Sequence, residues 1–307
     1  SKCVGCKNCE RHCPTDAIKV TPGVMPGYVP PCGTACPAGT DVQGYIALAG
    51  AGRYEDAYRL IRQSNPFPSV CGRICNHPCQ AACNRNDLDE SVGIRDIKRF
   101  VADKAFENGM PVVEKKRKSN GKKIAVIGAG PSGLSCAYYL QLSGYSVEVF
   151  ESESVAGGVL AYGIPEYRLP KAVLNRDIQA IEATGVQIHL NTTVGEDVSF
   201  DELYKKFHAV YVSTGTQLSR KANIPGEDMP GVYHGLDFLK AVNLGKPVEI
   251  GKKVAVIGGG NTAIDAARTA RRLGAEVTIV YRRQRNEMLG EERELLAAFE
   301  ERVRARD

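Results

Sequence analysis

The chain has 307 residues, of which 43% are hydrophobic and 24% charged, so its composition is that of an ordinary globular protein with room for about two domains. The net charge of +5 is too small to indicate a nucleic-acid partner, and no apolar run reaches the ~18 residues of a membrane span. Ten of the eleven cysteines lie in residues 1–83, which favours thiols kept reduced in the cytoplasm and committed to metal. We therefore expect a cytoplasmic protein without a nucleic-acid or membrane partner.

A short cysteine motif opens the chain. Its thiols have the spacing C-x2-C-x2-C-x3-C-P, in which bacterial ferredoxins bind 4Fe–4S clusters. They are Cys3, Cys6, Cys9 and Cys13. Zinc sites usually separate two C-x2-C pairs by a dozen or more residues, which disfavours zinc. Because the fourth cysteine of such a run can bind a second cluster, either Cys13 completes a single cluster or a partner run upstream has been lost. Residues 1–30 are predicted to be this motif and a linker.

Residues 31–110 are predicted to form an α-helical iron–sulfur domain, followed by a charged linker over 111–121. Apolar periodicity predicts helices over 41–52, 53–63 and 92–108. Six further cysteines accompany these helices. They are Cys32, Cys36, Cys71, Cys75, Cys79 and Cys83. The last four recur at every fourth residue, which in a helix would place several on one face. A second cluster here would need a non-cysteine ligand or a shared cysteine.

The rest of the sequence contains a β-α-β unit twice, which predicts an α/β fold with two nested dinucleotide-binding, Rossmann-like domains. In the first unit, "KIAVIGAG" is a buried strand that runs into glycines, "PSGLSCAYYLQLSG" is a helix and "SVEVFES" is a strand. The second unit repeats this layout with "KKVAVIGGG", "NTAIDAARTARRLG" and "EVTIVYRR". We expect an incomplete FAD-binding domain over 122–250 and the start of an NADP(H)-binding domain over 251–307.

The first glycine loop has the pattern G-x-G-x-x-G between a strand and a helix. Gly128 permits the tight turn, Gly130 lets the backbone approach a pyrophosphate, and Gly133 allows close packing of helix on strand. The phosphates would lie on the helix N-terminus, where free N–H groups favour anions. Glu151 ends the second strand and can accept hydrogen bonds from ribose hydroxyls. This combination favours FAD.

The second loop, "GGGNTA", carries Gly258 and Gly260 with Ala263 in the third position. Its second strand ends in Arg282 and Arg283 instead of an acid. Guanidinium groups attract a 2′-phosphate that a carboxylate would repel, which favours NADPH over NADH. A solvated strand end is the alternative for this arginine pair. Glycine-rich segments over 156–171 and 211–218 indicate backbone that passes close to a flat ligand.

With these motifs, the chain resembles the small (β) subunit of NADPH-dependent glutamate synthase and its relatives. These include the N-terminal half of dihydropyrimidine dehydrogenase and the larger subunit of electron-bifurcating ferredoxin–NADP transhydrogenases. The resemblance is carried by "CGTACPAGTDV", "NPFPSVCGRICNHPCQAAC", "VIGAGPSGL", "GGVLAYGIPEYRLPK", "STGT" and "VIGGGNTAIDAARTARRLGA". It implies FAD in the first dinucleotide-binding domain and NADP(H) in the second, behind a helical iron–sulfur domain.

The resemblance and the glycine loops together give a set of expected binding residues. For FAD these are Gly128, Gly130, Pro131, Ser132, Gly133, Glu151, Gly157, Gly158, Val159, Arg168, Val194 and Gly215. For NADP(H) they are Gly258, Gly260, Asn261, Thr262, Ala263, Arg282 and Arg283. The family implies Cys32, Cys36, Cys75, Cys79 and Cys83 as cluster ligands, with Cys71 as a ligand in a variant subfamily. We nominate no catalytic side chain, because hydride transfer between cofactors requires no general acid or base.

The resemblance implies an electron-transfer flavoenzyme of the glutamate synthase small-subunit type, which exchanges electrons among NADPH, FAD, one to three 4Fe–4S clusters and a partner. That partner would be a large subunit, a fused domain or a ferredoxin. A second hypothesis is an NAD(P)H:ferredoxin oxidoreductase, including a bifurcating one, and a third is a non-catalytic electron-wire fragment. The sequence departs from the family at "EMLGEE" (287–292), where Met-Pro-Ala is usual, and a ferredoxin run replaces an upstream C-x2-C pair. The family's segment that closes the FAD site does not occur before Asp307, so we expect a piece of a longer polypeptide.

Overall fold

The computed structural model describes residues 29–109, 114, 116–216, 219, 221 and 223–306. The ferredoxin-like run from Cys3 to Cys13 therefore lies outside the described residues. The chain divides into two units. Unit 1 comprises Ser1–Lys122, Ser135–Val147 and Ala172–Gln187, and unit 2 comprises Lys123–Leu134, Glu148–Lys171 and Ile188–Asp307. The domain boundaries predicted from the sequence divide the chain by the cofactor that each part is expected to bind, and these boundaries stay predictions.

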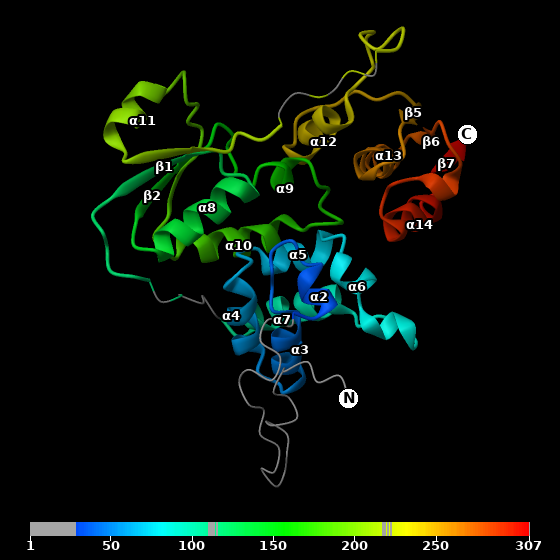
Figure 1. The fold of residues 1–307 in the computed structure, drawn as a ribbon. Coiled ribbons are helices and arrows are strands. Elements are labelled where there is room, and N and C mark those ends of the chain that lie inside the picture. The colour runs from blue at the N-terminus through cyan, green and yellow to red at the C-terminus, as the bar shows by residue number, and fades with distance from the viewer. Residues whose placement is uncertain are drawn as a thin grey trace. The chain divides into compact units, whose positions relative to one another are not determined.

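The cysteine-bearing part of unit 1 is helical (Figure 1). Its elements are α2 (Pro31–Thr34), α3 (Val42–Gly50), α4 (Tyr54–Arg62), α5 (Pro68–Ile74), α6 (Pro78–Ala81), η1 (Asn84–Asp87) and α7 (Ile94–Glu107). Apolar residues spaced three and four apart give α3, α4 and α7 a buried face, with Tyr45, Tyr58 and Val101 in one core. Helices α5 and α7 pack closely at Gly72. A Cβ added to this glycine would lie only 2.7 Å from the Cα of Arg99. The helices predicted from periodicity correspond to α3, α4 and α7.

The four cysteines that recur at every fourth residue do not share one helix, so the helical interpretation of this run is wrong. Cys71 lies in α5 and Cys79 in α6, whereas Cys75 has an extended backbone and ends α5. Pro78 explains the break, because its ring lacks an N–H and disfavours helical angles in the preceding residue. That residue, His77, has a φ of +40°. The thiols therefore come from separate short elements.

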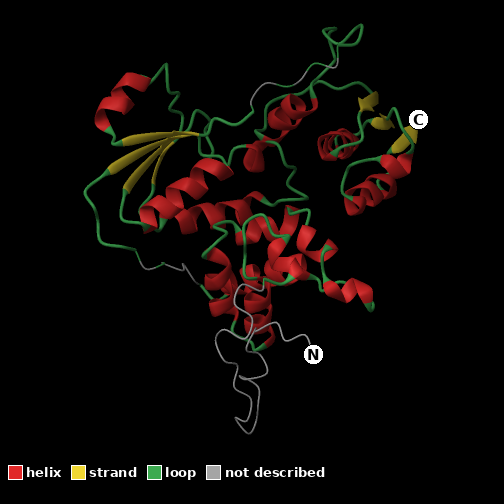
Figure 2. Cartoon of the chain, in the orientation of Figure 1, coloured by secondary structure: helices red, strands yellow, loops and turns green. Residues whose placement is uncertain are grey.

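The first β-α-β repeat belongs to a four-stranded sheet (Figure 2). The elements are β1 (Lys123–Ile127), α8 (Pro131–Leu142), β2 (Ser146–Phe150), α9 (Val159–Tyr162), α10 (Lys171–Glu182), β3 (Gln187–His189), α11 (Phe200–Lys206) and β4 (Ala209–Val212). The strand order is β3-β2-β1-β4, and β1 pairs with β4 in parallel, with Ile127 opposite Val212. Beyond Lys123, β1 is buried, as its unbroken apolar run predicts. The first glycine loop therefore begins at the carboxyl end of an inner strand.

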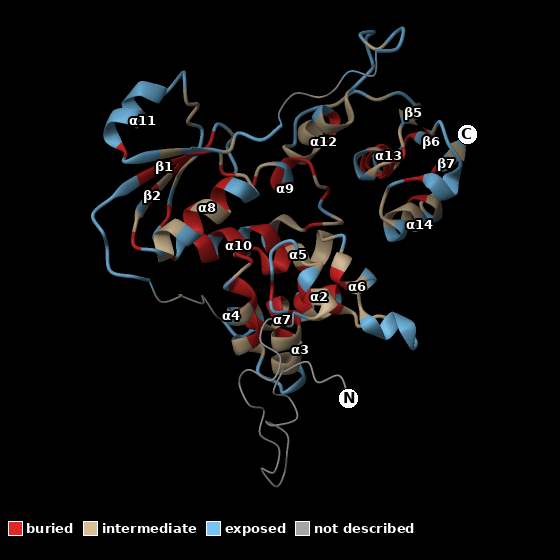
Figure 3. Ribbon diagram, viewed as in Figure 1, coloured by how far each residue is buried: buried red, intermediate tan, exposed pale blue. Residues whose placement is uncertain are grey.

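The second repeat builds a three-stranded sheet of order β5-β6-β7, in which both pairs are parallel. The elements are α12 (Gly235–Asn243), β5 (Lys253–Ile257), α13 (Asn261–Arg272), β6 (Glu276–Val280), η2 (Arg285–Glu287), α14 (Glu292–Glu300) and β7 (Arg304–Arg306). Helix α13 is largely buried (Figure 3), and its Ile264, Ala267 and Ala270 share a core with Ile279 of β6. The small residues of α13 let the helix lie close to the sheet.

This architecture confirms the predicted fold class, an α/β protein in which a helical, cysteine-rich segment precedes two dinucleotide-binding repeats in the sequence. Both repeats place a strand, a glycine loop, a helix and a second strand where the sequence predicts them. Within the described residues, every helix is too short or too polar to cross a membrane.

Candidate cofactor sites

The first glycine loop turns tightly at the end of β1. Gly128 has a φ of +100°, and a Cβ there would lie 2.5 Å from the carbonyl oxygen of Ser213. A Cβ on Gly133 would lie 2.0 Å from the carbonyl oxygen of Gly128. Gly130 has no neighbouring heavy atom within 4 Å of an added Cβ. Two glycines thus allow close packing of protein on protein, while the third leaves open space beside the loop.

A cavity of about 490 Å³ lies beside this loop. Nine of the residues predicted to bind FAD line it. They are Gly128, Gly130, Pro131, Ser132, Glu151, Gly158, Val159, Val194 and Gly215. Gly133 lies behind the lining, where it sets the approach of α8 to β1. Gly157 also lies outside the lining, and its φ of +116° lets the backbone turn toward Gly158.

The carboxylate of Glu151 is held in place by backbone N–H groups. Its Oε2 accepts from the N–H of Ala129 over 2.7 Å, and its Oε1 accepts from the N–H of Glu153 over 2.9 Å. The side chain is buried yet lines the cavity. Oε1 also accepts from the Ser152 hydroxyl over 3.3 Å, so Oε2, which accepts one hydrogen bond here, is the oxygen that keeps capacity for a ribose hydroxyl. Glu151 therefore fits the predicted role toward an adenosine.

Several cavity residues were not named individually from the sequence, although Tyr162 lies in the segment 156–171 and Ser213 and Thr214 in 211–218, both predicted to pass close to a flat ligand. Ser213 and Thr214 follow β4, while Thr192 and Tyr162 lie in other segments of the lining. The Ser213 hydroxyl donates to the carbonyl oxygen of Ile127 over 2.9 Å, which joins the ends of β1 and β4. The signal for Ser213 and Thr214 was available, because ligands of parallel sheets bind at the carboxyl ends of neighbouring strands.

Arg168, predicted to contact FAD, lies outside the lining of this cavity. Its guanidinium Nη1 lies 2.6 Å from Oδ2 of Asp265 in α13, and both side chains are buried. Glu291 and Glu294 also face Arg168, at 3.6 and 3.5 Å. Burial raises the pKa of Asp265 to about 6, although Arg168 opposes the rise. In this structure Arg168 fastens the segment before α10 to α13, and its contact with FAD stays a prediction.

The second glycine loop borders a cavity of about 720 Å³. Four residues predicted to bind NADP(H) line it. They are Gly260, Asn261, Thr262 and Ala263. Gly258 turns the chain with a φ of +131°. No side chain caps the N-terminus of α13 at Gly260, and its first turn contains no acid. The first N–H groups of α13 are thus placed to bind a phosphate group.

Arg282 and Arg283 are exposed and lie outside the lining of the second cavity. The register of β5 and β6 pairs Ile257 with Val280, so the arginines and the glycine loop follow neighbouring strands at one sheet edge. The segment that departs from the family packs on this loop, where the N–H of Gly290 donates to the carbonyl oxygen of Gly259 over 3.0 Å.

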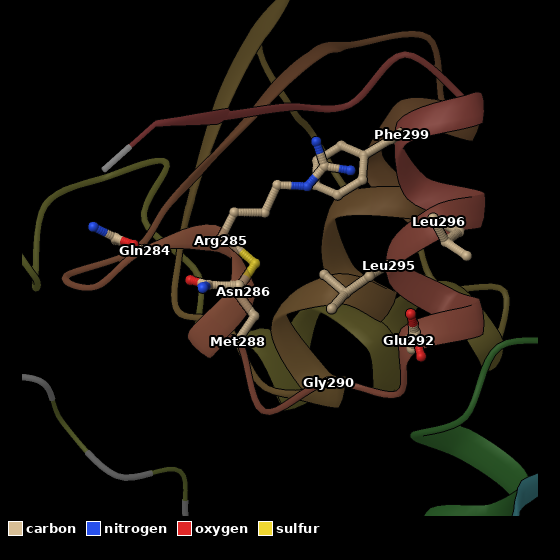
Figure 4. A pocket seen from close by; sticks show the side chains of 9 residues that line it. All are labelled: Gln284, Arg285, Asn286, Met288, Gly290, Glu292, Leu295, Leu296 and Phe299. Carbon is tan, nitrogen blue, oxygen red and sulfur yellow. The ribbon is translucent and has the colours of Figure 1, made fainter.

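A third cavity, of about 770 Å³, lies between η2 and α14 (Figure 4). The guanidinium carbon of Arg285 lies 3.6 Å from the centroid of the Phe299 ring, so this arginine is stacked on an aromatic face. Met288 and Leu295 supply apolar lining. Arg285 is thus engaged by the protein itself, which makes it a useful comparison for the exposed Arg282.

The six cysteines of residues 29–109 are free thiols. No three metal-binding side chains among the described residues converge on a point that could hold a single ion. A 4Fe–4S cluster is larger than an ion and takes its four thiolates from around a cube, so its ligands need not converge on one point. The N–H of His77 lies 3.3 Å from Sγ of Cys75, a contact of the kind that tunes cluster thiolates. The donor set therefore fits an iron–sulfur cluster.

Two parts of the chain and its N-terminal segment match known protein families. Residues 122–307 match the family model described as pyridine nucleotide-disulphide oxidoreductase. The chain belongs to the pyridine nucleotide-disulphide oxidoreductase family. Residues 25–110 match domain II of dihydropyrimidine dehydrogenase, described with a 4Fe–4S cluster, and residues 1–19 match a 4Fe–4S binding domain.

Two curated relatives and one solved structure illustrate how this member of the family compares. The chain is 44% identical to NADPH-Fe(3+) oxidoreductase subunit beta of Geobacter sulfurreducens, over 90% of this chain and 42% of the relative. It is 39% identical to the glutamate synthase [NADPH] small chain of Escherichia coli, over 89% of this chain and 61% of the relative. The structure of Mycobacterium tuberculosis FprA in complex with NADPH superposes with a TM-score of 0.50 at 27% identity, over 60% of this chain and 48% of FprA. The chain thus spans about half the length of the relatives it matches.

These matches confirm the predicted resemblance to the glutamate synthase small subunit and the predicted cofactor classes, FAD, NADP(H) and 4Fe–4S clusters. For the pyridine nucleotide-disulphide oxidoreductase region, FAD and NADP(H) suit the two glycine-loop cavities. The individual site residues stay predictions, including Cys3, Cys6, Cys9 and Cys13 outside the described residues.

Proposed function

We propose that this chain is the NADPH-, FAD- and cluster-binding part of a cytoplasmic electron-transfer flavoprotein that exchanges electrons with a redox partner subunit or fused domain. The observation that carries the proposal is the pair of glycine-loop cavities, the first beside Glu151 and the second on the sheet edge that Arg282 and Arg283 follow. FAD, when bound, supplies the step from two-electron hydride chemistry to the one-electron chemistry of iron–sulfur clusters.

The residues of the chain hold and orient the two nucleotides. Glu151 would accept hydrogen bonds from the adenosine ribose, and the space beside Gly130 would admit the pyrophosphate at the start of α8. The uncapped N-terminus of α13 would bind the NADP(H) phosphates, and Arg282 and Arg283 would face the 2′-phosphate. Thiolates from the short helices α2, α5 and α6 and from the residues between and after them would hold the clusters.

The names of both relatives include NADPH, which supports an NADPH-linked subunit. They differ in the reaction that uses the electrons: one name gives Fe(3+) and the other glutamate synthesis. We favour a role like that of the glutamate synthase small subunit, in which a large partner uses the electrons. A second candidate is an NAD(P)H:ferredoxin oxidoreductase, favoured by the match of residues 1–19 to a 4Fe–4S binding domain. Ferredoxin reduction and glutamate formation with an added large subunit, measured with one preparation, separate the two.

The test is an anaerobic preparation assayed for iron, sulfide and flavin, followed by dye reduction with NADPH and with NADH. We expect iron and sulfide in fours, bound flavin, and faster reduction with NADPH. The variant Cys79→Ser should lose iron, whereas Cys136→Ser, which changes the cysteine outside the cysteine-rich segment, should keep it. A colourless wild-type preparation would overturn the proposal. Bound cofactors without any dye reduction would favour the electron-wire fragment instead.

A further inference from the structure

A lysine lies buried inside the cysteine-rich helices. Lys98 of α7 is 7% exposed, although lysine is rarely buried in proteins unless it is paired. Its Nζ lies 5.9 Å from the ring centroid of Tyr45, which is itself fully buried. The Tyr45 hydroxyl donates to the carbonyl oxygen of Ile94 over 3.0 Å, which anchors the ring to the first turn of α7. Lys98 therefore ends in the core of unit 1 and not in solvent.

Three thiols, Cys36 after α2, Cys71 in α5 and Cys79 in α6, lie near enough to this ammonium group for its charge to act on them. Burial raises the pKa of the Cys71 and Cys79 thiols, and the positive charge of Lys98 opposes the rise. For Cys36, burial is outweighed by hydrogen bonds from Thr40 together with Lys98, so its pKa is lowered. Cys79 also belongs to the core cluster that contains Tyr45. These three thiols thus lie within the electrostatic reach of one cation.

Arg95, three residues before Lys98 on α7, is also 7% exposed, but its Nη1 donates to the carbonyl oxygen of Cys75 over 2.9 Å. The exposed basic side chains of α7 lie near carboxylates. Arg99 is 53% exposed and faces Asp103 at 3.7 Å, and Lys104 is 39% exposed and pairs with Glu107 at 2.6 Å. Among the described residues, no carboxylate forms an ion pair with Lys98. A buried cation without an anion is strongly disfavoured, so the position calls for negative charge nearby. A cluster held by four thiolates supplies that charge, and its charge becomes more negative on reduction.

We propose that Lys98 is the charge-compensating side chain of the iron–sulfur site held by Cys36, Cys71 and Cys79 with a further ligand, and that it raises the reduction potential of that cluster. The inference rests on the proposed function. Reduction adds one electron, supplied by NADPH through the flavin, and no proton or bond is exchanged. Because the reduced cluster carries one more negative charge than the oxidised cluster, a fixed cation stabilises the reduced form more.

The test compares Lys98→Met with Lys104→Met in the full chain. Lys104 lies on the same helix but is exposed, so it is a matched control for loss of one positive charge. Each cluster signal is followed by electron paramagnetic resonance during an anaerobic potentiometric titration. We expect the reduction potential of one cluster signal to be lower in K98M than in the wild type. The expected shift is ~59 mV, which for a one-electron couple is about a tenfold change in the equilibrium constant for reduction. All signals of K104M should keep the wild-type potentials.

Two further variants keep the test decisive. Lys98→Arg retains the charge and should keep a potential close to that of the wild type, and Lys98→Gln provides a second neutral side chain if K98M loses iron. The inference is overturned if the neutral variants hold full iron and sulfide with unchanged potentials, or if K98R shifts as far as K98M. Absence of iron from the wild-type chain would instead overturn the proposed function, so the two failures are distinguishable.

Discussion

The Oε2 atom of Glu151 accepts a hydrogen bond from the backbone N–H of Ala129 over 2.7 Å. This contact joins the residue after β2 to the glycine loop after β1, so the same carboxylate that faces the first cavity also fixes the loop. The site is thus organised before a ligand enters it. Preorganisation of this kind lowers the entropy cost of binding.

Removal of the carboxylate should weaken flavin binding. Glu151→Ala loses both the loop contact and the ribose acceptor, and we expect FAD affinity to fall about 10- to 100-fold, since hydrogen bonds to charged groups contribute ~1.5–3 kcal/mol. Glu151→Gln keeps one carbonyl acceptor and should lose less. Titration of the flavin-free protein with FAD, followed by flavin fluorescence, measures the change. Glu148→Gln, on β2 beside His189, is the control and should bind FAD normally. Unchanged affinity in E151A would contradict the assigned role.

Two glycines of the first loop should respond differently to alanine. A Cβ on Gly133 meets the carbonyl oxygen of Gly128 at 2.0 Å, so Gly133→Ala should destabilise the flavin-free protein by about 1–3 kcal/mol. A Cβ on Gly130 meets nothing within 4 Å, so Gly130→Ala should leave the thermal midpoint of the flavin-free protein unchanged. It should nevertheless weaken FAD binding at least tenfold if the pyrophosphate occupies that space. Equal losses of stability in both variants would argue against this division of roles.

The backbone of the first glycine loop could be predicted because its conformation depends on the spacing of nearby glycines. Gly128, Gly130 and Gly133 have roles that follow from spacing alone, once a buried strand precedes them and a helix follows. The position of Glu151 could be predicted for the same reason, since it directly follows β2. These features depend on residues close together in the sequence, where propensity and periodicity are informative.

The features of the fold that could not be predicted depend on contacts between residues that are distant in the sequence. Arg168 binds Asp265 across 97 residues, and nothing in the local pattern of either segment predicts that ion pair. The fourfold spacing of the cysteines does not predict one helix correctly, because α5 ends at Ile74 and a new helix, α6, begins at Pro78. Lys98 carried no signal at all, since a lysine in an amphipathic helix is usually exposed and only the packed core shows that this one is not.

Replacement of the two arginines after β6 should change the choice of nucleotide. The double variant Arg282→Ala with Arg283→Ala should raise the KM for NADPH about 10- to 100-fold, because two charge-assisted contacts to the 2′-phosphate would be lost. The KM for NADH should stay within about twofold, since NADH has no such phosphate. Steady-state dye reduction with each nucleotide gives both values. Arg285→Ala is the control, because its guanidinium stacks on Phe299. A parallel rise for both nucleotides would point to general damage and not to selectivity.

Close packing of α5 on α7 should make Gly72 intolerant of a methyl group. A Cβ there would lie 2.7 Å from the Cα of Arg99, so Gly72→Ala should destabilise the protein by about 1–3 kcal/mol despite the better helix propensity of alanine. At Gly50, the last residue of α3, a Cβ meets nothing within 4 Å. Gly50→Ala should therefore stabilise by about 0.5–1 kcal/mol. Thermal midpoints of the two variants should move in opposite directions, and a loss in both would refute the packing argument.

Asp177 should make the stability of the chain depend on pH. Its Oδ2 accepts from the N–H of Val70 over 3.0 Å, and burial raises the pKa of the carboxyl group from 3.8 to about 7. The folded state therefore keeps a proton that the unfolded state loses above pH ~4, so stability falls as pH rises toward ~7 and levels off above it. The slope is about 1.4 kcal/mol per pH unit, or on the order of 4 kcal/mol in all.

Asp177→Asn keeps an acceptor for Val70 but cannot ionise, so the free energy of unfolding measured with denaturant between pH ~5 and ~8 should lose this slope. The exposed Asp87→Asn variant should retain it, and a wild-type protein that gains stability across this range would show that Asp177 is charged when folded.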